Sequence, residues 1–568
     1  MKLVIKQYLE SLKERGELDA VLPDLLSQMG LEVFLKPGIG ARQFGVDVAA
    51  VGSIEGGEKK VYLFSIKSGD LGRKDWDSGG LQDLRPSINE IIDVFIPTRI
   101  PPEHKSKKIE ICLCFGGEIK EEVRPNVTSF TDSHTSESVR FSEWNGDKLS
   151  GFIENYFLRE ELLPTESRSL LRKSLAMIDE PTVSFKNFSA LVALLCDDNT
   201  RTPKQTLTVI RQLYICTWIL FAWCREADNL ESSYQASELV ILRSWDICRS
   251  YLGKRDKSSK AIFNALDAIF NLYIIISTYY LKSKIIPFVD KLHALSSAVS
   301  SSTPVDINLK LYDVLGRLAL AGIWHFWLFN KLSDDQLEQK EIFRNSVYEY
   351  QDAIKQLIIN NPILFSPYKD EQAIEIALAV LLLSIDGRND SDIKTLLTNI
   401  SESIYNQFAL NGSYPANIYT YSELIEHPID NSEEYRKSVT KGSILYPYIS
   451  IFSAIFNATE AYDTIKKLRE EFLKHCNFQI FFLNESSEEH LYSFNNMHGA
   501  ALSGVNIVQE PSDLLKDIAN ECEQSDYFRR LSAINYDLWP LILVSSRHFR
   551  LPVPIHFMMD LYSKGPEG

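Results

Sequence analysis

Short apolar runs separated by turn-forming residues characterise roughly the first 160 residues of the chain. Gly, Asp and Asn bound these runs, which is typical of β-strands joined by turns. The pattern predicts strands over residues 31–36, 44–51, 59–67, 109–115 and 139–142. The pair Gly56-Gly57 separates the second run from the third, so we expect those two strands to form a hairpin.

Apolar residues at helical spacing mark three further segments of this region, 3–29, 81–95 and 147–157. In the first segment, Pro23 disfavours helix at the residue before it, and Gly30 is suited to end the helix. In the second, Pro86 fits only in a first turn, so the regular helix should begin near it. Strands and helices together predict an α/β domain over residues 1–160, with a mixed sheet flanked by helices.

Long apolar and amphipathic stretches dominate the remaining residues, 161–568, and predict helices. These stretches are 184–196, 203–224, 236–251, 260–281, 308–329, 337–359, 371–385, 392–408, 444–476 and 513–520. Strand signals are few, and no repeat period is strong enough to indicate a repeat array. We therefore expect a large all-α region, which turns at 296–303 and 387–391 could divide near residue 300 or near residue 410.

Three uncharged stretches raise the question of a membrane span. Residues 442–459 contain no charged side chain over 18 positions, and 268–281 and 318–330 are similar but shorter. Each contains polar residues or a proline, and the two shorter stretches cannot cross about 30 Å of hydrocarbon as helices. Buried helices of a large core explain these stretches better than membrane spans do.

The N-terminus and the cysteines indicate the compartment. The first twenty residues mix charged and apolar side chains and lack the apolar core of a signal peptide. The eight cysteines are scattered without a CxxC pair, so they do not indicate a zinc knuckle. Buried thiols in a reducing compartment are the simplest interpretation, and we expect a cytoplasmic protein.

Charge and missing motifs exclude several classes of function. The formal net charge is −16, whereas a protein that coats nucleic acid is normally basic, because phosphate neutralisation supplies most non-specific affinity. Any nucleic-acid site must therefore be a local patch. The sequence has no Walker A motif, nucleophile elbow or HExxH, which argues against an NTPase motor, a serine hydrolase or a zinc protease.

Two adjacent predicted strands carry the residues that a metal-dependent phosphodiesterase needs. Asp47 lies near the start of one strand, and Ser65-Ile66-Lys67 ends the next. Side chains alternate with period two, so Ser65 and Lys67 share a face that Asp47 can also reach. A carboxylate can hold a divalent cation, and a lysine can orient the attacking water and stabilise charge on the phosphate.

At these residues the segment resembles the PD-(D/E)xK, or restriction-endonuclease-like, superfamily and in particular its Mrr-like members. The predicted order of elements, from the first helix through the G-x-D strand and the x-x-K strand to the next helix and strand, matches that pattern over residues 1–160. Residues 141–149 look like the closing strand, turn and helix. The resemblance implies a restriction-endonuclease-like fold, Mg²⁺ (or Mn²⁺) as cofactor and DNA as substrate. It also implies that Asp47 binds the metal and that Lys67 positions water.

The sequence departs from the family pattern at Ser65, where Asp, Glu or Gln is usual. Serine is a poor metal ligand, so an acid displaced in the sequence would have to complete the site. Asp83 and Glu90 are seven residues apart and share one face of the predicted helix. Alternatives in the loop before that helix are Asp70, Asp75 and Asp77.

An acid on the first helix is also common in this superfamily. Asp19 is the expected residue, with Glu17 and Asp24 as alternatives.

Basic and aromatic residues follow Lys67 and could contact a phosphate backbone. The set comprises Arg73, Lys74, Trp76, Gln82 and Arg85. In one interpretation, the basic side chains bind phosphates and Trp76 stacks on a base. In the other, the loop is simply solvated and Trp76 packs against its own domain.

These features predict a Mg²⁺-dependent DNA endonuclease whose helical region senses a trigger, binds a partner protein or drives self-association. Nucleases of this type fused to helical regions are familiar among bacterial restriction and anti-phage defence effectors, an analogy at the level of the fold. The alternative hypothesis is that Ser65 marks a loss of catalysis. The domain would then be a nucleic-acid-binding or protein-binding subunit of a defence complex.

Overall fold

The computed structural model describes most of the chain. The described residues are 5–6, 9–10, 12, 14, 18–36, 43–80, 83–157, 165–198, 200–299, 303–333, 335–494 and 498–564. The chain forms two compact units, one of residues 1–236 and 254–268 and the other of residues 237–253 and 269–568. The boundary predicted near residue 160 lies inside the first unit.

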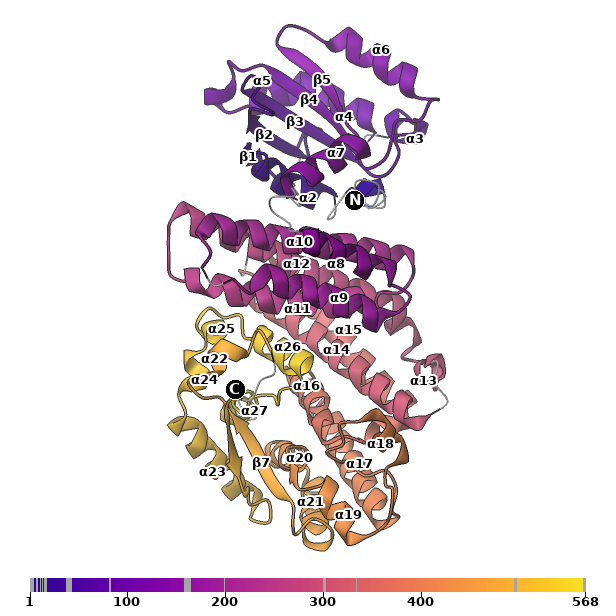
Figure 1. The fold of residues 1–568 in the computed structure, drawn as a ribbon, viewed down its shortest axis with the longest axis vertical. Helices are drawn as coiled ribbons and strands as arrows, with labels where there is room; N and C mark the ends of the chain where they lie inside the picture. The colour runs from indigo at the N-terminus through magenta and orange to yellow at the C-terminus, as the bar shows by residue number, and fades with distance from the viewer. Residues whose placement is uncertain are drawn as a thin grey trace. The chain divides into compact units, whose positions relative to one another are not determined.

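A mixed sheet forms the centre of the N-terminal region, with five strands in the part of the chain described (Figure 1). The strands are β1 (Glu32–Leu35), β2 (Val48–Gly52), β3 (Lys60–Lys67), β4 (Ile109–Phe115) and β5 (Val139–Trp144). They lie side by side in chain order. The first three strands pair antiparallel, and β3, β4 and β5 pair parallel. The predicted mixed sheet flanked by helices is confirmed.

Helices and helical turns cover both faces of this sheet. They are α2 (Asp19–Gln28), α3 (Arg73–Trp76), α4 (Leu84–Glu90), η2 (Ile91–Phe95), α5 (Ile96–Arg99), η3 (Pro102–His104), α6 (Arg124–His134), α7 (Gly146–Phe152) and η4 (Ile153–Phe157). Leu63 of β3 belongs to a buried cluster that includes Ile88 of α4. The next residue, Phe64, meets Trp144 edge-on, with ring centroids 4.8 Å apart. Successive strand residues point to opposite faces, so β3 is packed on both sides.

The ends of two helices test the expectations drawn from proline and glycine. Helix α2 continues through Pro23, so the expected break there is wrong: Pro23 is the fifth residue of α2, and its missing N–H removes a single intrahelical bond. Gly30 follows the helix with φ 86°, as predicted. Helix α4 begins at Leu84, which places Pro86 in its first turn, also as predicted.

The turn before β2 passes very close to α4. Gly45 has φ 78°, and a Cβ atom there would lie 2.0 Å from the backbone oxygen of Ser87. Gly56, in the predicted hairpin between β2 and β3, has φ 77° but no atom within 4 Å of such a Cβ. Backbone conformation therefore favours glycine at both positions, whereas close packing requires it at Gly45.

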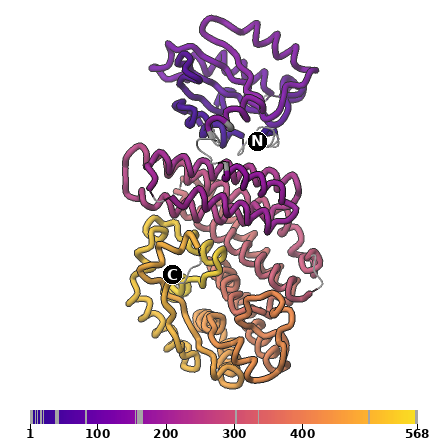
Figure 2. The backbone as a smooth tube through the Cα atoms, in the orientation of Figure 1, coloured from indigo at the N-terminus to yellow at the C-terminus, as the bar shows by residue number. Residues whose placement is uncertain are grey.

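Helices make up most of the remaining described residues, and Figure 2 follows the course of the chain through them. They are α8 (Thr165–Ala176), α9 (Pro181–Cys196), α10 (Pro203–Glu226), α11 (Glu231–Cys248), η5 (Arg249–Tyr251), α12 (Lys257–Lys284), η6 (Ile286–Phe288), α13 (Ala294–Ala298), α14 (Pro304–Lys331), α15 (Leu337–Asn360), η7 (Pro362–Phe365), η8 (Asp370–Gln372), α16 (Ala373–Leu383), α17 (Asp390–Ala409), α18 (Tyr421–Glu426), α19 (Glu433–Val439), α20 (Leu445–Ile455), α21 (Thr459–Glu471), α22 (Ser487–His490), α23 (Pro511–Gln524), α24 (Tyr527–Arg530), α25 (Ser532–Asn535), α26 (Pro540–Phe549) and α27 (His556–Lys564).

The expectation that this region is all-α is wrong in one place. A small sheet contains β6 (Gly442–Ser443), β7 (Asn477–Phe482) and β8 (Ala500–Ser503), in that order. The single helix expected over 444–476 is two helices, α20 and α21, because Asn457 adopts φ 53° between them. Asparagine enters this left-handed conformation more readily than most residues. Alternate residues of β7 are buried, the pattern of a half-exposed strand.

A buried network of charges joins helices within the second unit. Arg547 of α26 lies 2.5 Å from Glu238 of α11 and 2.5 Å from Asp313 of α14. Arg317 lies 2.8 Å from the same aspartate. Burial alone would raise the pKa of Glu238, but Arg547 and His548 hold that pKa below its usual value. These charges are paired, and removing one partner would leave the other buried without compensation.

Two long apolar helices and the state of the cysteines are relevant to the cellular location of the protein. Within the described residues, α10 and the segment Lys257–Phe288 are long and apolar enough to cross a bilayer, by length and composition only. The fold buries 72% and 50% of their most apolar windows, and core helices of soluble proteins pass the same test. All eight cysteines lie in the described part of the chain as free thiols, seven of them buried.

Gly45→Ala should destabilise the first unit much more than Gly56→Ala. Both substitutions force alanine into a left-handed conformation, which costs about 1–2 kcal/mol. Gly45→Ala also drives a Cβ into the backbone of α4, which adds about 1–3 kcal/mol. Chemical denaturation of the full-length variants would measure the difference. Equal losses would show that the contact between Gly45 and Ser87 has no importance for stability.

Candidate active site

Asp47 is held at the point where the chain enters β2. Its backbone N–H donates to the Phe64 carbonyl oxygen at 2.8 Å, and its Oδ2 accepts the Ile66 N–H at 2.7 Å. Val48 pairs with Phe64, so continuing the antiparallel register by one residue places Asp47 opposite Ser65. Asp47 was expected inside a strand, and it lies instead one residue before β2, after the turn at Gly45.

Lys67 is the last residue of β3, and its side chain is 11% exposed. Its Nζ donates to Oε2 of Glu14 at 3.0 Å, with the Glu14 side chain 31% exposed. Lys67 is two residues from Ser65 on the same strand face. The strand end therefore brings together Asp47, Ser65, Lys67 and an acid from the N-terminal segment.

Glu14 is the functional candidate that sequence reasoning missed. Asp19 was the expected acid on the first helix, with Glu17 and Asp24 as alternatives; Glu17 lies outside the described residues. A signal for Glu14 does exist: Ile5, Leu9 and Leu12 are all buried. Such spacing is typical of a helix face packed on a core, and an acid just beyond it can lie at the edge of that contact.

Negative charge accumulates around Asp47. Burial raises the pKa of its carboxyl to about 6. The hydrogen bond from Ile66 and the charge of Lys67 lower the pKa, and the charges of Glu14 and Asp19 raise it. The predicted residue Asp19 is thus close enough to act on Asp47, together with Glu14.

This set of donors fits a hard divalent cation in its chemistry. Mg²⁺ is typically held by one or two carboxylates, with water and phosphate oxygens completing its shell. The carboxylates of Asp47, Glu14 and Asp19 supply such oxygens, and their mutual repulsion favours a cation among them. Within the described ranges, however, no three His, Cys, Asp or Glu side chains converge closely enough to hold a metal alone.

Ser65 leaves a gap in the expected set of acids. Its side chain is 1% exposed and lies in the middle of this group. A hydroxyl carries no negative charge, so it cannot replace the missing carboxylate. The surroundings of the other predicted acids therefore decide whether a displaced carboxylate can complete the site.

The acids expected to compensate for Ser65 are mostly committed to their own loop. Oδ2 of Asp83 accepts the N–H groups of Ser78 at 2.5 Å and Gly80 at 3.0 Å, and these bonds lower its pKa. Asp75 accepts the Gly72 N–H at 3.1 Å.

Four more of the predicted acids have other surroundings. Asp70 accepts the Glu118 N–H at 3.0 Å, and Asp77 pairs with Arg85 at 2.6 Å. Glu90 is half-buried where α4 passes into the helical turn η2. Asp24 is half-buried, and burial raises its pKa against the opposing charges of Arg211 and Lys36. The charges that shift the pKa of Asp47 most are those of Lys67, Glu14 and Asp19, and none of these four acids is among them.

The predicted nucleic-acid contacts divide into two groups. Arg73 and Lys74 of α3 are exposed, and no ion pair engages either in the part of the chain described. Trp76 is 3% exposed and packs edge-on against Phe130 at 5.6 Å, so it cannot stack on a base and the stacking interpretation is corrected. Arg85 is exposed but paired with Asp77. Gln82 lies outside the described residues.

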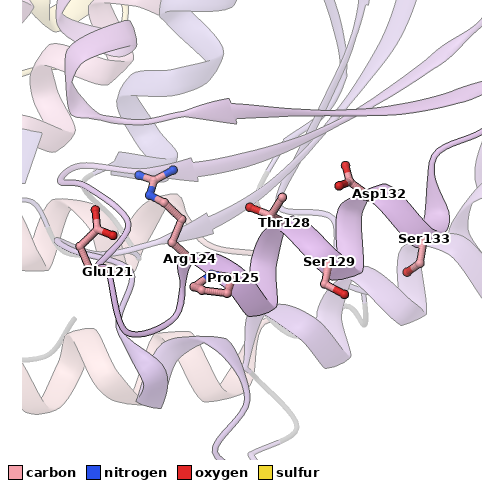
Figure 3. Close-up of a pocket in the computed structure, with 7 residues that line it drawn as sticks. All are labelled: Glu121, Arg124, Pro125, Thr128, Ser129, Asp132 and Ser133. Carbon is pink, nitrogen blue, oxygen red and sulfur yellow. The ribbon is translucent and has the colours of Figure 1, made fainter.

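A shallow groove of about 800 Å³ runs along α6 (Figure 3). Its lining residues are Glu121, Arg124, Pro125, Thr128, Ser129, Asp132 and Ser133. None of the side chains around Asp47 lines it, so the candidate site and this groove are separate features.

No protein-family model, curated protein or solved structure matches this chain.

Asp47→Asn should stabilise the full-length protein at pH 7.5. The folded protein binds a proton on Asp47 more tightly than the unfolded chain does, so the ionised carboxylate reduces stability above pH 6. Asparagine keeps the acceptor for Ile66 without the charge. The gain, at most about 3 kcal/mol, should shrink as the pH falls toward 4 and wild-type Asp47 becomes protonated. Thermal unfolding between pH 4 and 8 measures it.

Asp83→Asn provides the matched control, because hydrogen bonds favour the charged form of Asp83. This variant should be no more stable than wild type at pH 7.5. A loss of stability in Asp47→Asn at that pH would instead identify Asp47 as a structural residue.

Proposed function

We propose that the N-terminal sheet domain is a metal-dependent phosphodiesterase that cleaves DNA. The observation that carries this proposal is the meeting of Asp47, Lys67 and Glu14 at the end of an antiparallel strand pair. A buried lysine that lies beside one acid of raised pKa, Asp47, and donates to a second, Glu14, is unusual in a purely structural sheet. Groups of this kind concentrate at functional sites.

The order of elements adds support from topology. Helix α2, three antiparallel strands, the helical segments from α3 to η3, strand β4, helix α6 and strand β5 follow one another in the sheet domain, with β4 and β5 parallel to β3. This order agrees with the restriction-endonuclease-like pattern, in which the Asp and the Lys lie on the second and third strands. Here those positions belong to Asp47, directly before β2, and to Lys67 at the end of β3.

Each residue of the group has a distinct role in the proposed reaction. Asp47, with Glu14 and Asp19 nearby, would hold the cation, which supplies charge to polarise the phosphate and to acidify a bound water. The Lys67 ammonium donates hydrogen bonds toward the reacting oxygens and offsets their developing negative charge. Glu14, which accepts from Lys67, fixes the direction of that ammonium.

The charge distribution favours binding of DNA at a local patch and not over the whole surface. The chain carries a net charge of −16, so general attraction to phosphate is absent. Arg73 and Lys74 stand exposed on α3, a few residues beyond Lys67. These two cations offer phosphate contacts on the same connection that leaves the site.

The helical remainder would regulate this nuclease by sensing a trigger, by binding a partner protein or by self-association. The combination is similar to bacterial restriction and anti-phage defence effectors, at the level of architecture only.

A second candidate function is a nucleic-acid-binding or protein-binding module without catalysis. The buried Ser65, in place of an acid, is the specific observation in its favour. Metal binding separates the two functions, because a site that has lost its chemistry need not retain a cation.

Asp47→Ala and Lys67→Ala should each reduce the nicking of supercoiled plasmid DNA in Mg²⁺ or Mn²⁺ by at least about 100-fold, the usual scale for such groups. EDTA should stop the wild-type reaction. Asp83→Ala, which removes an acid of the neighbouring loop, should leave the rate close to wild type. Undiminished cleavage in both Asp47→Ala and Lys67→Ala would refute the assignment.

Mn²⁺ titration by calorimetry should give one site per chain in the wild-type protein. Asp47→Asn and Glu14→Gln should each weaken it by at least about tenfold, since each removes one anionic ligand or neighbour. Asp83→Asn should bind like wild type. A wild-type protein that binds no Mn²⁺ at millimolar concentration would favour the binding-module function.

A further inference from the structure

The N-terminal segment, described at residues 5–6, 9–10, 12 and 14, lies across the carboxyl ends of β3 and β4. At β3, Oε2 of Glu14 accepts from Nζ of Lys67 at 3.0 Å. At β4, a Cβ atom on Gly116 would lie 1.9 Å from the backbone oxygen of Leu9. Lys67 and Phe115 are register partners on parallel strands, so both contacts lie at one edge of the sheet.

The three loops that meet this segment are bonded to one another. The Gly117 N–H, after β4, donates to the Gly69 carbonyl oxygen, after β3, at 2.9 Å. The Gly146 N–H, after β5, donates to the Gly117 carbonyl oxygen at 3.0 Å. These loops therefore form one continuous support, and a shift of the N-terminal segment on this support would move Glu14 relative to Lys67.

Lys6 attaches the other end of the segment to the same support. Its Nζ lies 2.9 Å from Oε1 of Glu118 and 3.4 Å from Oδ1 of Asp147. The second carboxylate oxygen of Glu118 accepts from the side-chain amide of Asn145 at 2.9 Å. The hydrogen bond to Glu118 raises the pKa of Lys6, so the ammonium form is favoured. One ion pair thus holds the segment at Lys6, and another holds it at Glu14.

The contact at Lys6 has more effect on position than on stability. Ile5, Leu9 and Leu12 are buried and bind the segment to the domain, but burial of apolar surface has no preferred direction. A hydrogen-bonded ion pair has a defined geometry. The Lys6 side chain is 23% exposed and that of Glu118 41%, and a pair as exposed as this adds little stability.

We propose that Lys6 is a positioning residue for the candidate active site. By pairing with Glu118 and Asp147, it fixes the N-terminal segment so that Glu14 directs the Lys67 ammonium toward the reacting phosphate. The catalytic part of this inference rests on the proposed function, whereas the direction of Lys67 can be measured without DNA.

Lys60 provides a matched control at the opposite end of β3. Its side chain is 24% exposed, and its Nζ lies 2.8 Å from Oε2 of Glu110. Lys60 is the first residue of β3 and Lys67 is the last. Lys60→Met therefore removes a comparable ion pair from the same sheet and leaves the contacts of the N-terminal segment intact.

Acetylation of the full-length protein with acetic anhydride, followed by peptide mass spectrometry, measures the direction of Lys67. The wild-type Lys67 amine should react slowly, because its side chain is 11% exposed and donates to Glu14. In Lys6→Met, Lys67 should react at least about threefold faster, close to its rate in Glu14→Gln, because the local contact opens more often. Lys60 should keep its wild-type rate in Lys6→Met. Lys6→Arg, which keeps a cation, should restore slow labelling of Lys67, and Lys60→Met should leave that labelling unchanged.

Nicking of supercoiled plasmid in Mn²⁺ measures the catalytic consequence. Lys6→Met should lower kcat at least about tenfold and change KM less than about twofold, because a misdirected Lys67 weakens binding of the transition state and not of DNA. Lys6→Met should cause no further loss in a Glu14→Gln background, because its action passes through Glu14. Lys6→Arg and Lys60→Met should both cleave at close to the wild-type rate.

Four outcomes would overturn the proposal. They are unchanged labelling of Lys67 in Lys6→Met, faster labelling of Lys60 together with Lys67, a wild-type nicking rate in Lys6→Met, and a further loss in the Glu14→Gln background. A wild-type protein that does not nick DNA but shows the expected labelling would refute the proposed function alone. That labelling would still support the control of Lys67 by Lys6.

Discussion

A carboxylate kept largely out of water beside two others is the constraint around which the sheet domain is arranged. Burial of Asp47 is unfavourable unless hydrogen bonds and cations compensate for lost hydration. The Ile66 N–H and the Lys67 ammonium compensate in part, yet the pKa of Asp47 remains near 6. The apolar packing of β3 on both faces supplies the stability that lets this edge of the sheet remain electrostatically strained. The group of acids around Asp47 is therefore built on a core whose stability does not depend on neutralising their charge.

Local sequence patterns predicted a strand well where the apolar residues of that strand alone determine its conformation. The run 109–115 is almost wholly apolar, and it forms β4 with the predicted bounds. Helix α6 was missed, because only Val127 and Phe130 of its residues are buried and its other positions are mainly polar. In the second unit, the alternating residues of β7 follow a long apolar stretch that resembles one helix. Pairing with β8 then decides its conformation, and no local pattern reports that pairing.

The residues of the candidate site could be predicted where they lie close in sequence and not where they come from distant segments. Asp47 and Lys67 could be predicted, since neighbouring strands of a hairpin bring them together over a short span of sequence. The contact between Lys67 and Glu14 spans 53 residues and depends on the path of the N-terminal segment, which no local pattern describes. The sequence likewise left the burial of Trp76 undecided, because Trp76 packs on Phe130 of α6, a helix that the sequence did not predict.

The absence of lysine and arginine from residues 395–435, the segment that carries α18, also limits how this part of the protein can be mapped by mass spectrometry. Trypsin cleaves after Lys394 and next after Arg436, so the whole segment leaves the protein as one long peptide. Amine-reactive cross-linkers find no attachment point on it, and a complex formed there would escape detection by them. Reagents that couple carboxylates to amines, combined with a protease that cuts beside acids, would make the same surface visible.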